Sequence, residues 1–279
     1  MKIQFLGTAA AEGVPAVFCN CEYCNTAREL KGKNIRTRHQ TIINDDLLID
    51  LPADTFYHAL THQIRLDKVK YLVVTHAHCD HFYPQELMMK IKPYAHNQYS
   101  LTLDVYGGKS TEKLFLREFE NFDVDGFKNK VVFHLTEYYK PFKAGDYTIT
   151  PLPARHDTGN DARFYIIEYK NKKILYAHDT GIFFDEVYNY LEKLNVVFDF
   201  ISLDCTNGRL EWPDEQSHMG FCQIEKLIKK LYDIKVVNAD TVKYINHFSH
   251  NGNPIHEDLE SWASKHGFRV AFDGETVNI

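Results

Sequence analysis

The stretch Val69-Lys70-Tyr71-Leu72-Val73-Val74-Thr75-His76-Ala77-His78-Cys79-Asp80-His81 joins an apolar run to a dense set of metal-binding side chains. Its first seven residues are largely apolar and β-branched, which favours a buried strand. On a strand His76 and His78 point the same way, and the turn that follows can bring Asp80 and His81 beside them. Imidazole and carboxylate together suit zinc, manganese or iron. We therefore expect a metal site at the end of this strand, the alternative being a histidine-rich surface loop that binds no metal.

The segments around this stretch alternate between strand and helix patterns. In Met219–Tyr232, for example, apolar residues recur at the spacing of an amphipathic helix. Strands are predicted at Ile3–Leu6, Thr41–Ile43, Leu47–Leu51, Val131–Leu135, Tyr147–Leu152, Phe198–Leu203, Lys243–His247 and Arg269–Phe272, with a hairpin over Ala162–His178. Helices are predicted at Ala53–Gln63, Gln85–Ile91, Thr111–Asn121, Asp185–Leu194, Met219–Tyr232 and Ile255–His266. The alternation favours an α/β layered fold, and since no linker or repeat divides the sequence we expect one domain over residues 1–279.

Composition narrows the class of protein. Hydrophobic residues make up 44% of the 279 residues, which is enough for a sizeable core. The formal net charge of -6 argues against a long nucleic-acid substrate, although metals can make a local site positive. The sequence shows no signal-peptide pattern and no membrane span, so we expect a cytoplasmic protein.

The four ligands of His76-Ala77-His78-Cys79-Asp80-His81 match an HxHxDH signature. This signature resembles that of the metallo-β-lactamase superfamily, and the resemblance extends over essentially the whole chain. It implies an αββα four-layer sandwich with metals at the rim between the sheets. It also implies a later histidine, a bridging aspartate and a final histidine, each at a strand end. Residues in that order are His156, Asp179 and His247.

This resemblance implies that the chain binds two catalytic divalent metals, which would be zinc, manganese or iron. One is held by His76, His78 and His156, and the other by Asp80, His81 and His247, with Asp179 bridging them. Two such cations lower the pKa of a shared water, so the expected chemistry is hydrolysis by a metal-bound hydroxide. The ligands alone leave redox chemistry with iron open, but the diiron oxidoreductases of the superfamily carry a flavin domain for which this chain has no room.

Three of the six cysteines form a CxCxxC cluster, Cys19, Cys21 and Cys24, near residues 19–24. A structural zinc needs four ligands, and His250 is a candidate for the fourth. The alternative is three unrelated reduced thiols. With HxHxDH and a terminal HxxH, the cluster resembles a narrower group that contains the phosphoribosyl cyclic phosphate phosphodiesterase of phosphonate breakdown. The PQQ-biosynthesis accessory protein has a similar loop. The resemblance implies that one structural zinc ties the N-terminal loop to the rim of the active site.

The same group places an aspartate and a later histidine near the leaving group. Here these are Asp204 at a strand end and His218, which we expect to open the helix Met219–Tyr232. His218 could protonate a leaving alkoxide with help from Asp204, or it could be a polar helix cap. We count His218, Asp204 and Asp80 as catalytic. The basic residues considered as phosphate ligands are Arg155, Arg163 and Arg209.

The sequence thus predicts a dinuclear-metal hydrolase, a phosphodiesterase for a small cyclic or otherwise compact phosphodiester, with no membrane partner. Three alternatives stay open: a non-catalytic metabolite-binding accessory protein, a tRNA 3′-end nuclease, and a carbonyl-ester hydrolase such as a thioesterase or lactonase. The sequence lacks the basic arm with which tRNA 3′-end nucleases grip tRNA, and its acidic net charge disfavours binding to a nucleic acid. A homodimer is compatible with the sequence.

Overall fold

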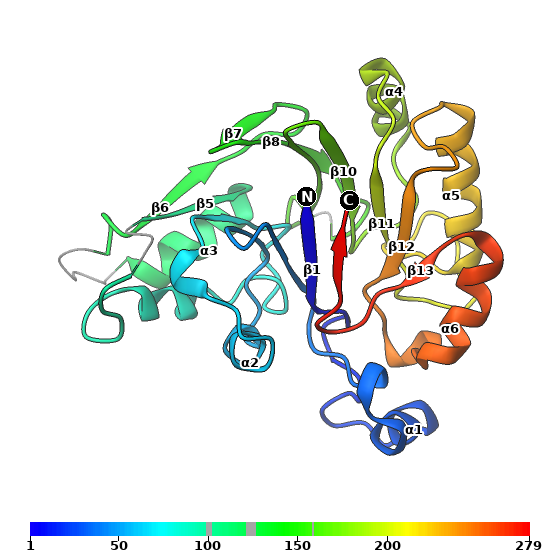
Figure 1. The fold of residues 1–279 in the computed structure, drawn as a ribbon, viewed down its shortest axis with the longest axis horizontal. Helices are drawn as coiled ribbons and strands as arrows, with labels where there is room; N and C mark the ends of the chain where they lie inside the picture. The colour runs from blue at the N-terminus through cyan, green and yellow to red at the C-terminus, as the bar shows by residue number, and fades with distance from the viewer. Residues whose placement is uncertain (99–101, 121–126, 158) are drawn as a thin grey trace.

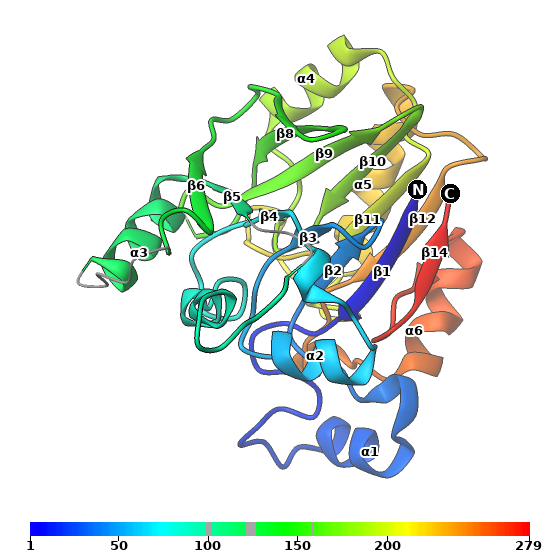
Figure 2. The same cartoon turned by 60° about the vertical axis from the view of Figure 1, so that its left-hand side comes forward.

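The computed structural model describes all residues of the chain except 99–101, 121–126 and 158. The described chain forms two seven-stranded sheets that face each other (Figure 1). In spatial order the first sheet consists of β14 (Thr276–Asn278), β1 (Lys2–Gly7), β2 (Gln40–Ile43), β3 (Leu47–Ile49), β4 (Tyr71–Val73), β5 (Leu103–Gly107) and β6 (Val131–Leu135). The second consists of β13 (Arg269–Val270), β12 (Val242–Asn246), β11 (Phe200–Asp204), β10 (Lys172–Ala177), β9 (Arg163–Tyr169), β8 (Tyr147–Pro153) and β7 (Phe142–Ala144). Strand β1 pairs with β14, so the first and last residues lie side by side (Figure 2).

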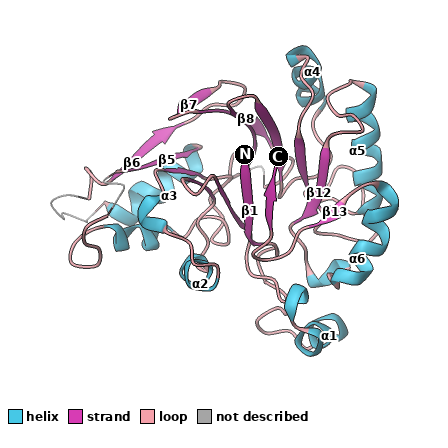
Figure 3. Ribbon diagram, in the orientation of Figure 1, coloured by secondary structure: helices cyan, strands magenta, loops and turns pink. Residues whose placement is uncertain are grey.

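Helices cover the outer face of each sheet (Figure 3). The α-helices are α1 (Glu22–Leu30), α2 (Thr55–Thr61), α3 (Lys109–Phe119), α4 (Asp185–Leu194), α5 (Phe221–Asp233) and α6 (His256–Ala263). Short 3₁₀ helices occupy Gly32–Asn34, Leu66–Lys68, Pro84–Lys90, His250–Gly252 and Ser264–His266. Among the described residues, no helix is long and apolar enough to cross a membrane.

Three apolar clusters fill the three spaces between the layers. Because strand residues alternate between faces, Ile43 and Val73 point between the sheets while Ile42 and Leu72 point at the helices outside the first sheet. The central cluster contains aromatic residues of the second sheet, such as Tyr176. A third cluster joins that sheet to α4, α5 and α6. Four layers follow from this arrangement, which confirms the predicted αββα sandwich.

Several predicted elements differ from the observed ones. The strand at Val69–Thr75 is shorter, since β4 ends at Val73 and His76 lies in the following loop. The helix predicted at Gln85–Ile91 is the 3₁₀ helix Pro84–Lys90. Helix α5 begins at Phe221, so His218 precedes it in a loop and does not open it. Of the helix predicted at Thr111–Asn121, Asn121 lies outside the described residues.

Candidate metal centre

The predicted ligands converge because they follow strands that end at one edge of the sandwich. Strands β3 and β4 are parallel in one sheet, and β10, β11 and β12 are parallel in the other. Side chains that follow their carboxyl ends therefore meet between the sheets. Three residues that follow these strand ends, Asp50 together with the ligands Asp179 and His247, adopt left-handed backbone with φ of 63°, 53° and 64°. Such strain is concentrated at functional sites and aims the side chains into one space.

The first group of ligand atoms comes from three histidines and one aspartate. His76 Nε2 lies 2.9 Å from His78 Nδ1 and 3.1 Å from Asp179 Oδ2, and His156 Nε2 lies 3.2 Å from His78 Nδ1. Ligands at tetrahedral positions around zinc are separated by roughly 3.3 Å. The atoms that face each other in this group fit around one ion.

The second group consists of Asp80, His81, His247 and again Asp179, with ligand atoms within 4.8 Å of one another. His81 Nε2 lies 3.0 Å from Asp179 Oδ2 and 3.3 Å from Asp80 Oδ2. Among the described residues, His81 Nε2, His247 Nε2 and Asp179 Oδ1 are buried and, although charged neighbours lie close to them, make no well-oriented hydrogen bond. Buried polar atoms need a partner, and a cation would supply one here. Because Asp179 belongs to both groups, it can bridge two ions.

Two residues that the sequence analysis missed fix the orientation of these histidines. The buried Asp50 accepts a hydrogen bond of 2.7 Å from His81 Nδ1, which leaves His81 Nε2 free for a metal. Thr206 Oγ1 lies 2.7 Å from His247 Nδ1 and frees His247 Nε2 in the same way. The only sequence signal for Asp50 is its place at a strand end, and Thr206 has none beyond its nearness to Asp204.

Four buried carboxylates make this edge strongly attractive to cations. For Asp50, Asp80, Asp179 and Asp204, burial raises the pKa, but neighbouring histidines outweigh it and hold each pKa below its usual range. Burial also opposes protonation of His81, yet Asp80 and Asp50 raise the pKa of His81 well above its usual value. Buried charges must be compensated. Protons on histidines compensate them in a metal-free chain, and divalent ions can replace those protons.

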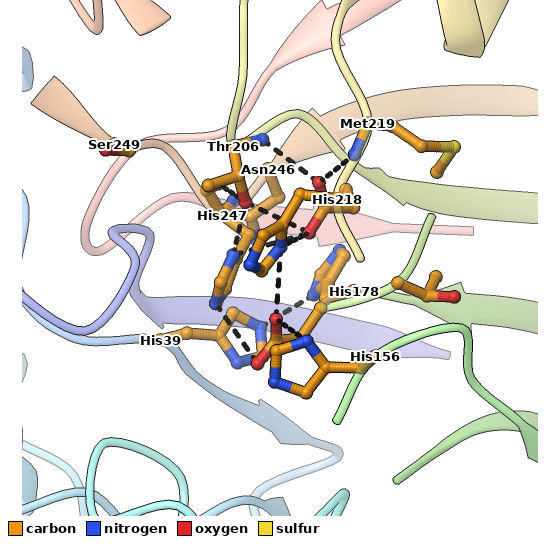
Figure 4. Close-up of polar contacts among 12 residues, drawn as sticks. His39, His156, His178, Thr206, His218, Met219, Asn246, His247 and Ser249 are labelled. Carbon is orange, nitrogen blue, oxygen red and sulfur yellow. Dashed lines mark hydrogen bonds and ion pairs between the residues drawn. The ribbon is translucent and has the colours of Figure 1, made fainter. Parts of the chain in front are cut away.

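His218 and Asp204 lie beside this centre. His218 Nδ1 is 3.4 Å from Asp204 Oδ2 and 3.2 Å from Asp179 Oδ1 (Figure 4). Burial disfavours the imidazolium form, but the hydrogen bond and charge of Asp204 outweigh burial and raise the pKa of His218 to about 9. Asp204 also accepts hydrogen bonds from the backbone of Thr206 and Met219, which fix its position. Asp179, Asp204, His218 and His247 are close enough to hold an ion themselves, so metal binding by His218 is the alternative to a catalytic role.

The three cysteines of the predicted zinc loop surround His250. Its Nδ1 atom lies 3.4, 3.5 and 3.6 Å from the Sγ atoms of Cys19, Cys21 and Cys24. One nitrogen and one sulfur ligand on a tetrahedral zinc are separated by roughly 3.5 Å, so the four atoms fit a structural zinc. The hydrogen bond from His250 lowers the pKa of Cys21 to about 6, whereas burial raises the pKa of Cys24 to about 11.

A cavity of about 490 Å³ opens above the metal centre. It is lined by ligand residues including His78 and Asp179, by His218, and by the small-residue loop that contains Ala10 and Ala11. Its volume is that of a site for a small molecule.

The three arginines considered as phosphate ligands are not among the residues that line this cavity. Arg155 donates to the carbonyl of Ile182, and Arg163 is buried and paired with Asp161. Arg209 donates to the carbonyl of Asp258. Each of these arginines is therefore engaged outside the cavity.

Comparison with known proteins places this geometry in a family. A diphosphatase of the PhnP family shares the fold with a TM-score of 0.74 at 19% identity, covering 100% of this chain and 97% of the other. Zinc-bound PqqB from Methylobacterium extorquens gives 0.75 at 16% identity, with 100% of both chains covered. The short form of human tRNase Z gives 0.67 at 16% identity, with 100% and 99% covered. No curated protein matches this chain by sequence. The family model described as the beta-lactamase superfamily domain matches residues 47–241, more than half of the sequence, and the chain therefore belongs to the beta-lactamase superfamily.

Proposed function

We propose that this chain is a dinuclear-metal-dependent phosphodiesterase that hydrolyses a small, compact phosphodiester. The observation that carries the proposal is the position of His218, which lines the cavity, contacts Asp179 of the metal centre and is held by Asp204. Zinc, manganese or iron ions held by the two ligand groups would lower the pKa of a water and accept charge from phosphoryl oxygens.

The chain's own residues supply the remaining steps. His218 would donate a proton to the leaving oxygen, and Asp204 would keep the imidazole oriented toward the cavity. A thioester has less need of this acid because a thiolate leaves without a proton, so the position of His218 favours a substrate with an alkoxide leaving group, such as an alkyl phosphodiester, over a thioester.

The direct test is turnover by protein loaded with zinc or manganese. We expect hydrolysis of bis(4-nitrophenyl) phosphate and of a ribose cyclic phosphate, with activity abolished in Asp179→Ala because the bridging carboxylate is lost. Hydrolysis of thioesters or lactones without phosphodiester turnover would identify a carbonyl-ester hydrolase. A fully loaded protein that turns over neither class would support the accessory-protein alternative.

The role of His218 is tested by the leaving group. In His218→Ala, we expect turnover of the ribose cyclic phosphate to fall by ~10²–10⁴-fold, the usual contribution of a placed acid. Turnover of the nitrophenyl diester should fall far less, because nitrophenolate leaves without a proton. Equal losses on both substrates would indicate that His218 positions substrate, and loss of a bound metal would make it a ligand.

A further inference from the structure

One of the five histidines in the two ligand groups is far more exposed than the others. The side chain of His78 is 36% exposed, whereas the side chains of the other four are at most 9% exposed, namely His76, His81, His156 and His247. Packing holds a buried ring in place, but a half-exposed ring keeps rotamer freedom that it loses when it binds an ion. The strength of metal binding by His78 therefore depends on whatever else orients its ring.

The carboxylate of Asp157 supplies such a contact. The Nδ1 atom of His78 lies 2.9 Å from His76 Nε2 and 3.2 Å from His156 Nε2. The Nε2 atom of His78 lies 3.2 Å from Asp157 Oδ2. Nδ1 is therefore the nitrogen that faces the ligand group, and Nε2 can donate to the carboxylate. A hydrogen bond of this kind fixes the tautomer and the direction of a metal-binding histidine and makes it a stronger ligand.

Asp157 is itself held by the loop that follows the ligand His156. Its Oδ1 atom accepts a hydrogen bond of 2.9 Å from the backbone of Gly159, and its Oδ2 atom accepts one of 2.6 Å from the side-chain amide of Asn160. Within the described chain Asp157 belongs to neither ligand group, so it can act on an ion only through His78.

The first ligand group contains less negative charge than the second. Among its described members Asp179 is the one carboxylate, and it is shared with the second group. The second group also contains Asp80 and has the buried Asp50 behind His81. A carboxylate behind His78 would therefore compensate part of the charge of the first ion, as Asp50 does for the second.

We propose that Asp157 is a positioning residue for the first metal ion: it holds His78 with Nδ1 toward the ligand group and strengthens the binding of that ion. The alternative is an ordinary surface contact, since exposed ion pairs contribute little to stability. The two roles differ in a measurable quantity, because a surface contact does not change the affinity for a metal. The inference concerns ion binding and does not depend on which ester the centre hydrolyses.

The test is competition for zinc between the loaded protein and a chelator. In Asp157→Ala we expect one catalytic ion to bind about 10–100-fold more weakly, the usual effect of losing such a partner. Asp157→Asn keeps an oxygen that can accept from His78 but loses the charge, so its affinity should be intermediate. Glu225→Ala is a matched control, since Glu225 lies 3.2 Å from His266 Nε2 with similar exposure. An Asp157→Ala protein that retains zinc as well as this control would overturn the inference.

Two further measurements separate the positioning of His78 from a general loosening of the loop. Because both side chains of the pair are partly exposed, formate from solution can replace the missing carboxylate in Asp157→Ala. Formate should restore most of the lost affinity, and sodium chloride at the same ionic strength should not. Asn160→Ala removes a contact within the loop but leaves the carboxylate, so it should bind zinc nearly as the wild type does. Failure of formate to rescue, or a loss in Asn160→Ala as large as in Asp157→Ala, would refute the positioning role.

The second ion provides an internal comparison. Asp50 supports His81 of the second group, so Asp50→Asn and Asp157→Ala should each weaken mainly one catalytic ion, and a different one. The double variant should therefore have two weakened ions. A double variant in which a single ion is weakened twice would mean that Asp157 does not act on the first group. Because no substrate is present, these outcomes are independent of whether the protein proves to be a phosphodiesterase.

Discussion

Asp50 illustrates how a single buried carboxylate organises the candidate metal centre. It is fully buried and accepts hydrogen bonds from His81 Nδ1, from Thr75 N at 2.7 Å and from Thr75 Oγ1 at 3.0 Å. His39 Nδ1 lies 3.5 Å away, and His39 in turn contacts His178. Asp50 therefore fixes both the tautomer and the direction of His81 without touching the cavity.

Asp50→Asn should weaken metal binding and spare the fold. The amide has nearly the same shape, but it removes the negative charge that orients and polarises His81. Loss of such a partner typically lowers metal affinity or activity 10–100-fold. Competition with a chelator measures the affinity. Asp104→Asn is a matched control, since Asp104 pairs with His134 at 2.8 Å in a half-buried position outside the ligand groups. Equal chelator sensitivity of both variants would contradict a role for Asp50.

Sequence reasoning could find the ligand residues but not the residues that support them. His76, His78, Asp80 and His81 lie within six residues, so their spacing alone predicts a metal site. Asp50 and Thr206 lie 31 and 41 residues from the histidines they orient, His39 lies 139 residues from His178, and no ligand motif surrounds any of the three. Only the pairing of strands brings them together, and one sequence does not specify that pairing.

At the scale of elements, the loop that holds the cysteines has little apolar support of its own. Helix α1 contributes Ala27 to a small cluster that also includes Ala9, Val14 and Ile255. Phe18 is fully exposed, so the loop buries little of its apolar surface. A metal bound by the three cysteines and His250 would supply the missing stabilisation, because the binding free energy of a structural metal contributes to folding.

Cys21→Ser should therefore remove one metal and lower the melting temperature. With two ions at the centre and one in the loop, we expect about three ions per chain in the wild type and about two in the variant. A loss of about 2–3 kcal/mol corresponds to a melting temperature lower by roughly 5–10 °C for a chain of this size. Metal analysis and thermal unfolding provide the measurements, with the exposed Cys222→Ser as the control. An unchanged metal count and melting temperature would refute a structural metal at this loop.

Sequence patterns failed to predict some elements, or predicted the wrong type of helix, where the backbone conformation depends on contacts with distant residues. Strand β5 alternates Leu103 and Val105 toward the helices with Tyr106 toward the second sheet, but its five residues do not distinguish strand from loop. The segment Pro84–Lys90 has a helical pattern yet forms a 3₁₀ helix. Proline at its start and Pro93 shortly after its end leave little length for an α-helical ladder.

At the scale of the whole molecule, the layers are joined by buried polar contacts as well as by apolar clusters. His58 on α2 is fully buried, and its two ring nitrogens lie 2.6 Å from Gln40 Oε1 on β2 and 2.7 Å from Thr37 Oγ1. The Gln40 amide continues to the Asp50 carbonyl and to Thr55 Oγ1. One neutral imidazole thus links the helical layer to the sheet that carries the metal centre.

This link should make the stability of the molecule depend on pH. Burial, with a smaller effect of nearby His62, lowers the pKa of His58 to about 3. Between about pH 6.5, the pKa of an unfolded histidine, and pH 3, the unfolded chain binds a proton at this position that the native chain does not. The free energy of unfolding therefore falls as the pH decreases, and the share due to His58 is roughly 2 kcal/mol at pH 5.

Urea unfolding of the wild type and His58→Gln at pH 7 and pH 5 measures this share. Metal ligands titrate in both proteins, so we expect the variant to lose roughly 2 kcal/mol less stability than the wild type over this interval. Equal losses in the two proteins would mean that the native state accommodates a protonated His58, and that the contact between α2 and β2 does not require a neutral imidazole.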